Sequence, residues 1–385
     1  MLHLSRKMYA KKVDFNILLQ NFYSSWQNNL STSIKTFKKS MPTLVNEDKT
    51  ISKKTNPVID QIQGDFKIIK CVGCKPAFDF KPLSLNMLKK IRYCLKVDNL
   101  TNYCGDRSYY FLGPLAKIEH ALVKYTLDKL IKNGFKLISV PDILPDELIN
   151  RCGMDTVGER NQVYSLDDNH YGNKWCLSGT SEMALAGSLM NKNISKDKLP
   201  LKLCAVSRCY RAEVSSIAEE KGIYRVHQFT KVEMFGACLP EESENMALYF
   251  RNLQEELFQP LGLHYRVLDM AKHELGTQAY RKYDIEAWMP GRNKYGEISS
   301  CSDCTNYQAK RLGIRSDNIY LHTVNGTACA VPRLIIALAE THQTADGTLK
   351  LPEKLNSYVR GHNLLNIQSN FPKFTPVQAH RYKII

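Results

Sequence analysis

The segment that most constrains the fold of this chain is RCYRAEVSSIAEEKGIYRVHQFTKVEMF, residues 208–235. Its two ends, 209–213 and 224–235, are rich in β-branched, aromatic and alternating residues, whereas the SSIAEEKG between them is small, charged and ends in glycine. This pattern predicts a strand, a loop and a second strand that pair as an antiparallel hairpin. Because alternate residues of a strand share a face, we expect Arg211 and Glu213 to point the same way.

The second strand of this hairpin carries a mixed set of side chains on one face. The same parity is shared by Arg225, Phe229, Lys231 and Glu233. Cations suit phosphates, an aromatic ring suits a stacked base, and carboxylates suit an ammonium group, so this face predicts a site for ATP beside an amino acid. The alternative is that the alternating charges form only the solvated face of a hairpin.

This segment closely resembles the motif 2 hairpin of class II aminoacyl-tRNA synthetases, and GIYRVHQFTKVEMF is similar to the seryl-tRNA synthetase version. The resemblance implies that Arg211 clamps the α-phosphate and the activated carboxyl group. It also implies that Arg225 holds the distal phosphates, that Phe229 stacks on adenine, and that Glu213 contacts the adenine or the tRNA acceptor end. Two neighbouring positions are likewise assigned to ATP, Ala212 and Val226.

A second segment, LSGTSEMALAG at 177–187, places Thr180 and Glu182 two residues apart on an expected strand or strand end, so both side chains point the same way. It resembles the Thr-x-Glu serine-binding motif of the family. The resemblance implies that Thr180, Ser181 and Glu182 bind the amino acid, since a hydroxyl and a carboxylate together can orient an α-ammonium group. The alternative is that TSE is only a helix N-cap.

A third segment, 284–312, contains YGEISSCSD and resembles the strand that brings a metal-binding glutamate to the ATP phosphates. The resemblance implies that Glu297 holds Mg²⁺ and that Ser300 supports the ion or a phosphate oxygen. It places Ile298 and Ser299 beside ATP. Hard divalent ions prefer a few carboxylate oxygens plus substrate phosphates, so a single well-placed glutamate suffices.

The same segment shows which branch of the family the chain resembles. DIEAWMPG, and Gly296 where bacterial members usually carry arginine, match the mitochondrial branch more closely. Two positions depart from the usual pattern: Asp303 stands where asparagine is usual, and Asn306-Tyr307 stands where Asp-Phe is usual. The residues present are close in size and shape to the usual ones, so we expect these departures to affect only the local hydrogen bonds.

A fourth segment, VNGTACAVPRLIIALAETHQ at 324–343, resembles motif 3. Pro332 suits a first helical turn, and the apolar run after it predicts a buried helix. Arg333 in that turn is unfavourable for the helix dipole unless an anion lies beside it, and a nucleotide phosphate would be that anion. By resemblance, Asn325 and Thr327 line the serine pocket; alternatively, Thr327 is only a small turn residue.

The chain shows no G-x-x-x-x-G-K-[ST] loop, no H-E-x-x-H and no nucleophile elbow, so the sequence offers no candidate for covalent catalysis. The resemblance implies that serine itself attacks ATP to form seryl-adenylate, and that the terminal ribose hydroxyl of tRNA(Ser) then takes the seryl group. Catalysis would rest on positioning and charge by Arg211, Arg333 and Glu297. Glu233 and Thr327 would select serine through its hydroxyl.

The resemblance also predicts the fold. Residues 63–385 are expected to form one α+β class II catalytic domain, a mostly antiparallel sheet of six or more strands flanked by helices. Motif 1 is placed at GFKLISVPDIL, 134–144, with Pro141 as its characteristic proline. In the family this motif builds a two-fold interface, so a homodimer is expected, and a heterodimer with a synthetase paralogue is the alternative.

Basic charge is concentrated at the N-terminus. The chain has a formal net charge of +15, and its first 100 residues hold 18 Lys and Arg against 7 Asp and Glu. Residues 1–25 are typical of a mitochondrial transit peptide, which predicts the matrix; a basic RNA-contacting arm is the alternative. No apolar run of about 18 residues is present, so no membrane partner is expected. Two C-x-x-C pairs, at 71–74 and 301–304, are too far apart to suggest a zinc knuckle.

Residues 26–62 predict a shortened tRNA-binding arm or a linker. Apolar residues recur every three to four positions from Phe15 to Met41, which favours one amphipathic helix, and the polar stretch after it is too short for an equal second helix. The short arm, and the acidic pair in Glu219-Glu220-Lys221 where an acceptor stem would approach, keep a second hypothesis open. In it the chain is an inactive synthetase-like paralogue that serves as a binding or regulatory partner.

Overall fold

The computed structural model describes residue 62 and residues 64–359, with gaps at 89–90, 98–99, 101–103, 157–160, 168–173 and 214–221. All of these residues belong to one compact unit, Thr55–Ile385. The predicted transit peptide lies outside the described residues, as do the predicted arm, apart from Ile62, and the acidic pair of the motif 2 loop. No described helix is both long and apolar enough to cross a membrane.

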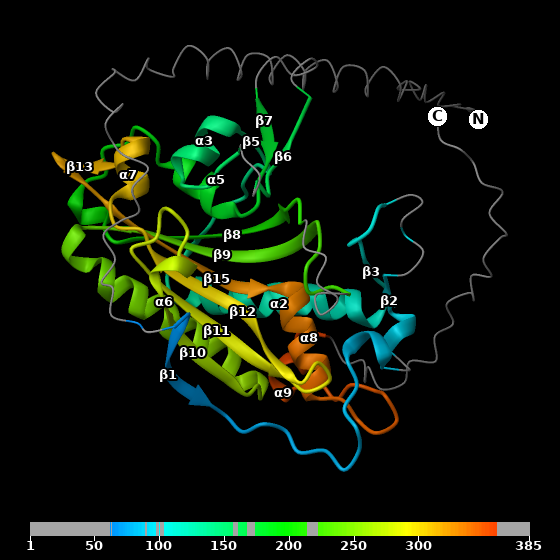
Figure 1. Ribbon diagram of the computed structural model, residues 1–385. Helices are drawn as coiled ribbons and strands as arrows, with labels where there is room; N and C mark the ends of the chain where they lie inside the picture. Colours follow the sequence, from blue (N-terminus) through cyan, green and yellow to red (C-terminus); the bar gives the residue numbers. More distant parts are fainter. Residues whose placement is uncertain are drawn as a thin grey trace, which may run out of the picture. The chain divides into compact units, whose positions relative to one another are not determined.

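An eight-stranded sheet organises the described part of the chain (Figure 1). Neighbouring strands are antiparallel, except that the outermost strand β4 runs parallel to β8. The prediction of a mostly antiparallel sheet is therefore confirmed. In spatial order its strands are β1 (Phe66–Val72), β10 (Tyr265–Met270), β11 (Arg281–Met289), β12 (Lys294–Asp303), β15 (His322–Ala330), β9 (Gln228–Cys238), β8 (Leu201–Tyr210) and β4 (Lys136–Leu137).

Helices cover one face of this sheet and enclose the larger core (Figure 1). Period-two alternation makes this possible: on β9, Val232 and Met234 are fully buried against this helical layer. Phe250 of the helical layer belongs to the same core and is also fully buried. The helices are α2 (Pro114–Lys132), α6 (Ser243–Phe258), α8 (Val331–Thr341) and the short α9 (Glu353–Asn356).

A second, smaller core lies on the other face of β8 and β9. Phe235 and Ala237 alternate with the residues of the first core and point into this one. The elements that cover it are α3 (Asp146–Arg151), α5 (Ser181–Ser188), α7 (Tyr307–Leu312) and a three-stranded sheet of β5 (Ile143–Pro145), β7 (Trp175–Leu177) and β6 (Tyr164–Ser165). Two further pairs are β2 (Leu95–Lys96) with β3 (Tyr110–Phe111), and β13 (Arg315–Ser316) with β14 (Ile319–Tyr320).

The motif 2 hairpin is present, but its strands differ from the predicted ones. Strand β8 ends at Tyr210 and β9 begins at Gln228, so Arg211, Glu213 and Arg225 lie beyond the regular ladder. The reason is that the chain changes partners there: the amide of Arg211 still bonds across the hairpin to the His227 carbonyl (2.9 Å), but the next amide donates to the Gln162 carbonyl (2.8 Å). The chain at Ala212 is thereby held by a different loop.

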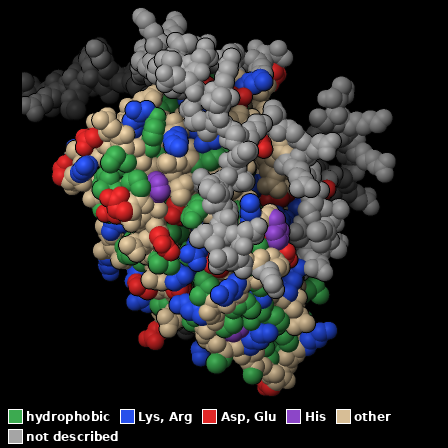
Figure 2. All heavy atoms as spheres, turned by 60° about the vertical axis from the view of Figure 1, so that its left-hand side comes forward, with side chains coloured by type: hydrophobic (Ala, Val, Ile, Leu, Met, Phe, Trp, Pro, Cys, Tyr) green, Lys and Arg blue, Asp and Glu red, His purple; other side chains and the backbone are tan. Residues whose placement is uncertain are grey.

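Charge on the described surface is mixed. Figure 2 shows one face on which Lys and Arg side chains lie among acidic and apolar ones. The described part of this face is therefore not a single basic patch. Most of the net positive charge of the chain lies in its first 100 residues, and many of these are outside the described residues.

Candidate active site

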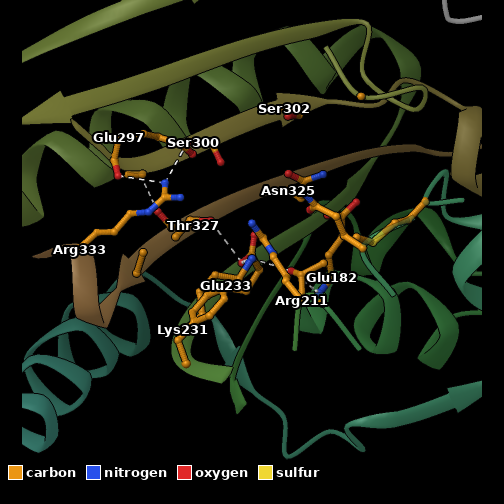
Figure 3. A pocket seen from close by; sticks show the side chains of 18 of the residues that line it. Glu182, Arg211, Lys231, Glu233, Glu297, Ser300, Ser302, Asn325, Thr327 and Arg333 are labelled. Atoms are coloured by element: carbon orange, nitrogen blue, oxygen red, sulfur yellow. Dashed lines mark hydrogen bonds and ion pairs between the residues drawn. The ribbon is translucent and has the colours of Figure 1, made fainter. Parts of the chain in front are cut away.

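A cavity of about 480 Å³ opens on the sheet face that α2, α6 and α8 leave uncovered. Its floor comes from β9, β12 and β15, and its rim from hairpin residues 211, 213 and 223–226 and the start of α8. Figure 3 shows two ends, with Glu297 and Arg333 at one and Glu182, Glu233 and Asn325 at the other. Strands distant in sequence thus place two chemically different ends side by side.

Glu182 is the central group of the second end, which we call the amino-acid end (Glu182, Glu233, Lys231, Asn325 and Thr327). It is buried, and its carboxylate accepts a hydrogen bond from Gln308 Nε2 at 2.6 Å. Gln308 is held in turn by the Thr323 hydroxyl, which donates to its Oε1 at 2.8 Å. Burial raises the pKa of Glu182 to about 7, and the negative charge of Glu233 adds to the shift.

The expected strand at Thr180 and Glu182 is wrong. Helix α5 begins at Ser181, and Thr180 is its N-cap, with its hydroxyl oxygen accepting from the Glu182 amide at 3.3 Å. A Thr-Ser-Glu tripeptide caps helices well, and here the cap and the site use the same residues. Thr180 and Glu182 both line the cavity, because the first turn of α5 projects its side chains there. Ser181 is buried and does not line it.

Lys231 joins the two sides of the amino-acid end. Its ammonium donates to the Thr180 hydroxyl oxygen at 2.7 Å and forms an ion pair with Glu233. Both side chains of the pair are buried, 7% and 2% exposed, so each charge depends on the other for compensation. The Thr327 hydroxyl donates to the same Glu233 carboxylate oxygen at 3.4 Å. A lysine between two glutamates therefore lowers the net charge of a buried acidic pocket.

The other end, which we call the phosphate end (Glu297, Arg333 and Ser300), is built from β12 and the start of α8. Arg333 Nη1 donates to the Glu297 carboxylate at 3.0 Å and to the Glu297 carbonyl oxygen at 3.2 Å. Burial would raise the pKa of Glu297, but the charges of Arg333, then Lys282 and Arg211, outweigh it and lower that pKa. An anion expected beside Arg333 is therefore present in the structure, and it is this carboxylate.

Between the two ends lies Arg211. Its guanidinium carbon is 5.3 Å from the centre of the Phe229 ring, while its Nε atom is buried and has no hydrogen-bond partner among the described residues. A buried donor without a partner costs free energy, and an anion bound beside the guanidinium would remove that cost. The position of Arg211 therefore suits the binding of an anionic group. Nearby, Arg225 Nη1 donates to the Glu213 carboxylate at 3.4 Å. The arrangement offers cations and a half-buried aromatic ring to an anionic nucleotide.

The residues present fit a magnesium ion carried by a nucleotide. The Glu297 side chain is 36% exposed and faces the cavity, and Ser300 lines the same cavity from the same strand. A carboxylate and a hydroxyl with open space beside them are what Mg²⁺ uses when phosphates complete its shell. The unusual Asp303 accepts from the Thr305 amide at 2.8 Å, a bond that an asparagine carbonyl oxygen could also accept.

Most of the sequence-predicted site residues come together. Every predicted site residue lines this cavity except two. Ser181 is buried in the first turn of α5, and Ala212 donates its amide to the Gln162 carbonyl. Sequence reasoning missed several lining or supporting residues. Lys231 is not one of them, because its parity already placed it on the site face of the hairpin, whereas Gln308, Lys282 and Tyr224 carry no such signal, because only the folded chain brings them to the site.

A large antiparallel sheet with nucleotide- and amino-acid-type ends defines the catalytic core of a class II aminoacyl-tRNA synthetase, and residues 164–342 match the tRNA synthetase class II core domain (G, H, P, S and T). The chain is 41% identical over 310 residues to the serine–tRNA ligase of Treponema denticola, covering 78% of this chain and 72% of that protein. The chain belongs to the seryl-tRNA synthetase family.

Two further relatives agree. The chain is 43% identical over 310 residues to the mitochondrial serine–tRNA ligase of Mus musculus, covering 79% of this chain and 59% of the mouse protein. This chain thus spans less than two thirds of the length of the mouse protein. The crystal structure of seryl-tRNA synthetase from Pyrococcus horikoshii complexed with ATP superposes with a TM-score of 0.76 at 30% identity, covering 91% of this chain and 83% of that one.

Proposed function

We propose that this protein is a serine–tRNA ligase that activates serine with ATP and transfers it to tRNA(Ser). The observation that carries the proposal is that one cavity joins the buried carboxylates Glu182 and Glu233 to Arg211 and the Arg333–Glu297 pair. An amino acid with its ammonium at the carboxylates would direct its own carboxylate toward Arg211. An ATP molecule with its phosphates at Arg333 would reach the same point.

The first step needs no protein nucleophile. A carboxylate oxygen of serine attacks the α-phosphorus of ATP, and the bond to pyrophosphate breaks, which yields seryl-adenylate and pyrophosphate. Arg211 would hold the two reacting groups and stabilise charge on the α-phosphate, Arg225 and Arg333 would bind the distal phosphates, and Phe229 would stack on adenine. Mg²⁺ held at Glu297 and Ser300 would neutralise phosphate charge.

The second step transfers the seryl group to RNA. The terminal ribose hydroxyl of tRNA(Ser) attacks the acyl carbon, and AMP leaves with the electrons of the broken acyl–phosphate bond. Thiols near the pocket are poor nucleophiles here, because burial raises the pKa of both Cys152 and Cys304 well above the ordinary value. The chemistry is left to the substrates, and the protein supplies position and charge.

Selectivity for serine follows from the amino-acid end. Glu233 and Thr327 are both buried and already share a hydrogen bond, so a substrate hydroxyl can join it. Alanine would leave these groups without that partner, at a cost of roughly 1–3 kcal/mol for each. Threonine would bring an additional methyl group into a pocket built of packed side chains.

Serine-dependent exchange of labelled pyrophosphate into ATP tests the proposal without tRNA. We expect exchange by the wild-type protein and a loss of roughly 100-fold or more in Arg211→Ala. The matched control is Arg208→Ala, three residues earlier on β8 and outside the cavity, where Arg208 donates to Thr230 at 3.0 Å. A folded wild-type protein without exchange would instead support the inactive paralogue.

We infer that the protein acts in mitochondria, in the matrix, and the similarity to a relative named as mitochondrial supports this.

The proposed domains remain 1–25 as transit peptide, 26–62 as short arm or linker, and 63–385 as catalytic domain. A homodimer through motif 1 is supported by exposed apolar side chains in and just before this motif: Ile131 on α2, Leu137 on the outermost strand β4 and Ile143 on β5 are each 50% exposed. Light scattering of Leu137→Lys tests it, with a monomer expected.

A further inference from the structure

Tyr224 contacts both charged residues of the phosphate end at once. Its hydroxyl oxygen accepts a hydrogen bond from the Glu297 amide at 3.2 Å. Its backbone carbonyl accepts from Arg333 Nε at 3.2 Å, and the centre of its ring lies 4.6 Å from the Arg333 guanidinium carbon. One residue of the hairpin therefore fixes the strand that carries Glu297 and the side chain of Arg333.

A second arginine supports the Tyr224 ring from the turn between β11 and β12. The guanidinium carbon of Arg292 lies 4.5 Å from the ring centre, within the range of a cation–π contact. The turn is itself fixed to α8, because the Arg292 amide donates to the Glu340 carboxylate at 3.0 Å. Helix α8 also carries Arg333, so the Tyr224 ring contacts two arginines that are both connected to the same helix.

Gly296 provides the space that the ring occupies. A Cβ atom at 296 would lie 2.9 Å from Tyr224 Cε2 and 2.8 Å from Met289 Cε, closer than side chains approach each other. Any larger residue at 296 would therefore displace the ring from its position. The glycine of β12 and the tyrosine of the hairpin form a matched pair, and Glu297 is the next residue after that glycine.

We propose that Tyr224 is a positioning residue for Mg²⁺-bound ATP, which holds Arg333 and Glu297 in the arrangement that the nucleotide requires. This inference rests on the proposed function. The two side chains pair with each other at 3.0 Å, and a metal and phosphates would draw on both. The Tyr224 carbonyl and ring hold the guanidinium through contacts that do not involve Glu297, so the carboxylate can turn to a metal while Arg333 stays in place.

The test is nucleotide binding by calorimetry, with Mg²⁺ and with excess EDTA, for the full chain and three variants. Tyr224→Phe keeps the ring and removes the bond to the Glu297 amide, whereas Tyr224→Leu also removes the cation–π contacts. The matched control is Tyr295→Phe, on the strand of Glu297 but outside the cavity, where the hydroxyl bonds to His264 at 2.8 Å and Arg266 lies 4.3 Å from the ring centre.

We expect Tyr224→Phe to weaken binding of Mg²⁺-bound ATP by roughly 2- to 10-fold, the value of one hydrogen bond, and Tyr224→Leu to weaken it by about 10-fold or more. For Tyr224→Phe, the affinity for ATP in EDTA should fall less than the affinity for Mg²⁺-bound ATP, because Glu297 has no metal to hold when Mg²⁺ is removed. Serine affinity and the Tyr295→Phe control should stay within about twofold of wild type.

Three results would overturn the inference. If both Tyr224 variants bind Mg²⁺-bound ATP as wild type does, the residue positions nothing. If serine affinity falls as much as ATP affinity, the role is general folding, which thermal unfolding of each variant checks directly. If the wild-type protein binds no ATP, the proposed function fails together with the inference, whereas wild-type binding with unchanged variants overturns the inference alone.

Discussion

Serine binding should release a proton from Glu182 at neutral and mildly acidic pH. This carboxyl has a pKa of about 7, raised first by burial and then by the charge of Glu233. The groups that oppose the shift are Gln308, Lys231 and Asn325. A bound ammonium group favours the ionised carboxylate, so serine lowers the pKa and expels the proton.

The magnitude follows from the pKa. With a value near 7, roughly nine-tenths of the Glu182 carboxyls are protonated at pH 6 and about one-tenth at pH 8. Serine affinity should therefore fall by about tenfold from pH 8 to pH 6, which is about 1.4 kcal/mol. Over this range the ammonium of serine stays charged, so the change reports the protein group.

The assay is isothermal titration calorimetry in buffers of different ionisation enthalpy. At pH 6 the slope of observed enthalpy against buffer enthalpy should correspond to roughly 0.9 protons released for each serine bound, and at pH 8 to roughly 0.1. The control variant Asp155→Asn removes an acid that follows the cavity-lining Met154 in the chain, and it should leave the slope unchanged. Glu182→Gln should remove the slope together with most of the binding.

Thermal unfolding gives an independent check with a definite sign. The pKa of Glu182 in the folded protein lies above the ordinary value, so its contribution to stability is present at low pH and is lost as pH rises through about 7. Serine neutralises the penalty, hence its stabilising effect should be larger at pH 8 than at pH 6. Serine affinity and proton release that do not vary between these pH values would refute the assignment of Glu182 to the ammonium group.

Three further predictions concern selectivity and packing. Glu233→Gln should lower serine activation by roughly 10-fold or more in pyrophosphate exchange and leave ATP binding within about twofold, and equal losses for the two substrates would defeat the assignment. Phe250→Ala should cost about 3–5 kcal/mol in urea unfolding, because this ring is fully buried against the sheet; a cost below about 1 kcal/mol would contradict the packing. Gly291→Ala should cost about 1–3 kcal/mol, since its Cβ would lie 2.1 Å from the Leu83 carbonyl oxygen, a backbone atom that cannot move freely. Gly236→Ala is the comparison, with less loss expected because its Cβ would meet the flexible Met246 side chain, and a larger loss there would reverse the argument.

Local patterns predicted the parts of the site that lie on single elements. The parity of Phe229, Lys231 and Glu233 on one strand is geometric, and the structure turns all three to the cavity. Pro332 lies in the first turn of α8 as its sequence indicates, because a residue without an amide proton fits there. These signals depend on neighbours within a few positions, which the sequence contains in full.

Some local patterns were ambiguous for a physical reason. Thr-Ser-Glu satisfies both a strand end and a helix N-cap, and only packing of α5 against β8 and β9 selects the helix. The ends of the hairpin strands were misplaced because the loop around Gln162 competes for the amide of Ala212. A competing partner that lies so far away along the chain leaves no trace in local propensity.

The sequence by itself determined the family, the class of fold and most of the side chains that line the cavity, since these follow from motifs whose residues lie close together in the chain. Tertiary structure alone decided the electrostatic state of those side chains. Burial raises the pKa of Glu182 and the charge of Glu233 adds to the shift, whereas the charges of Arg333, Lys282 and Arg211 outweigh burial and lower the pKa of Glu297. Two glutamates of the same chemical type thus differ in charge because desolvation and nearby cations depend on three-dimensional position.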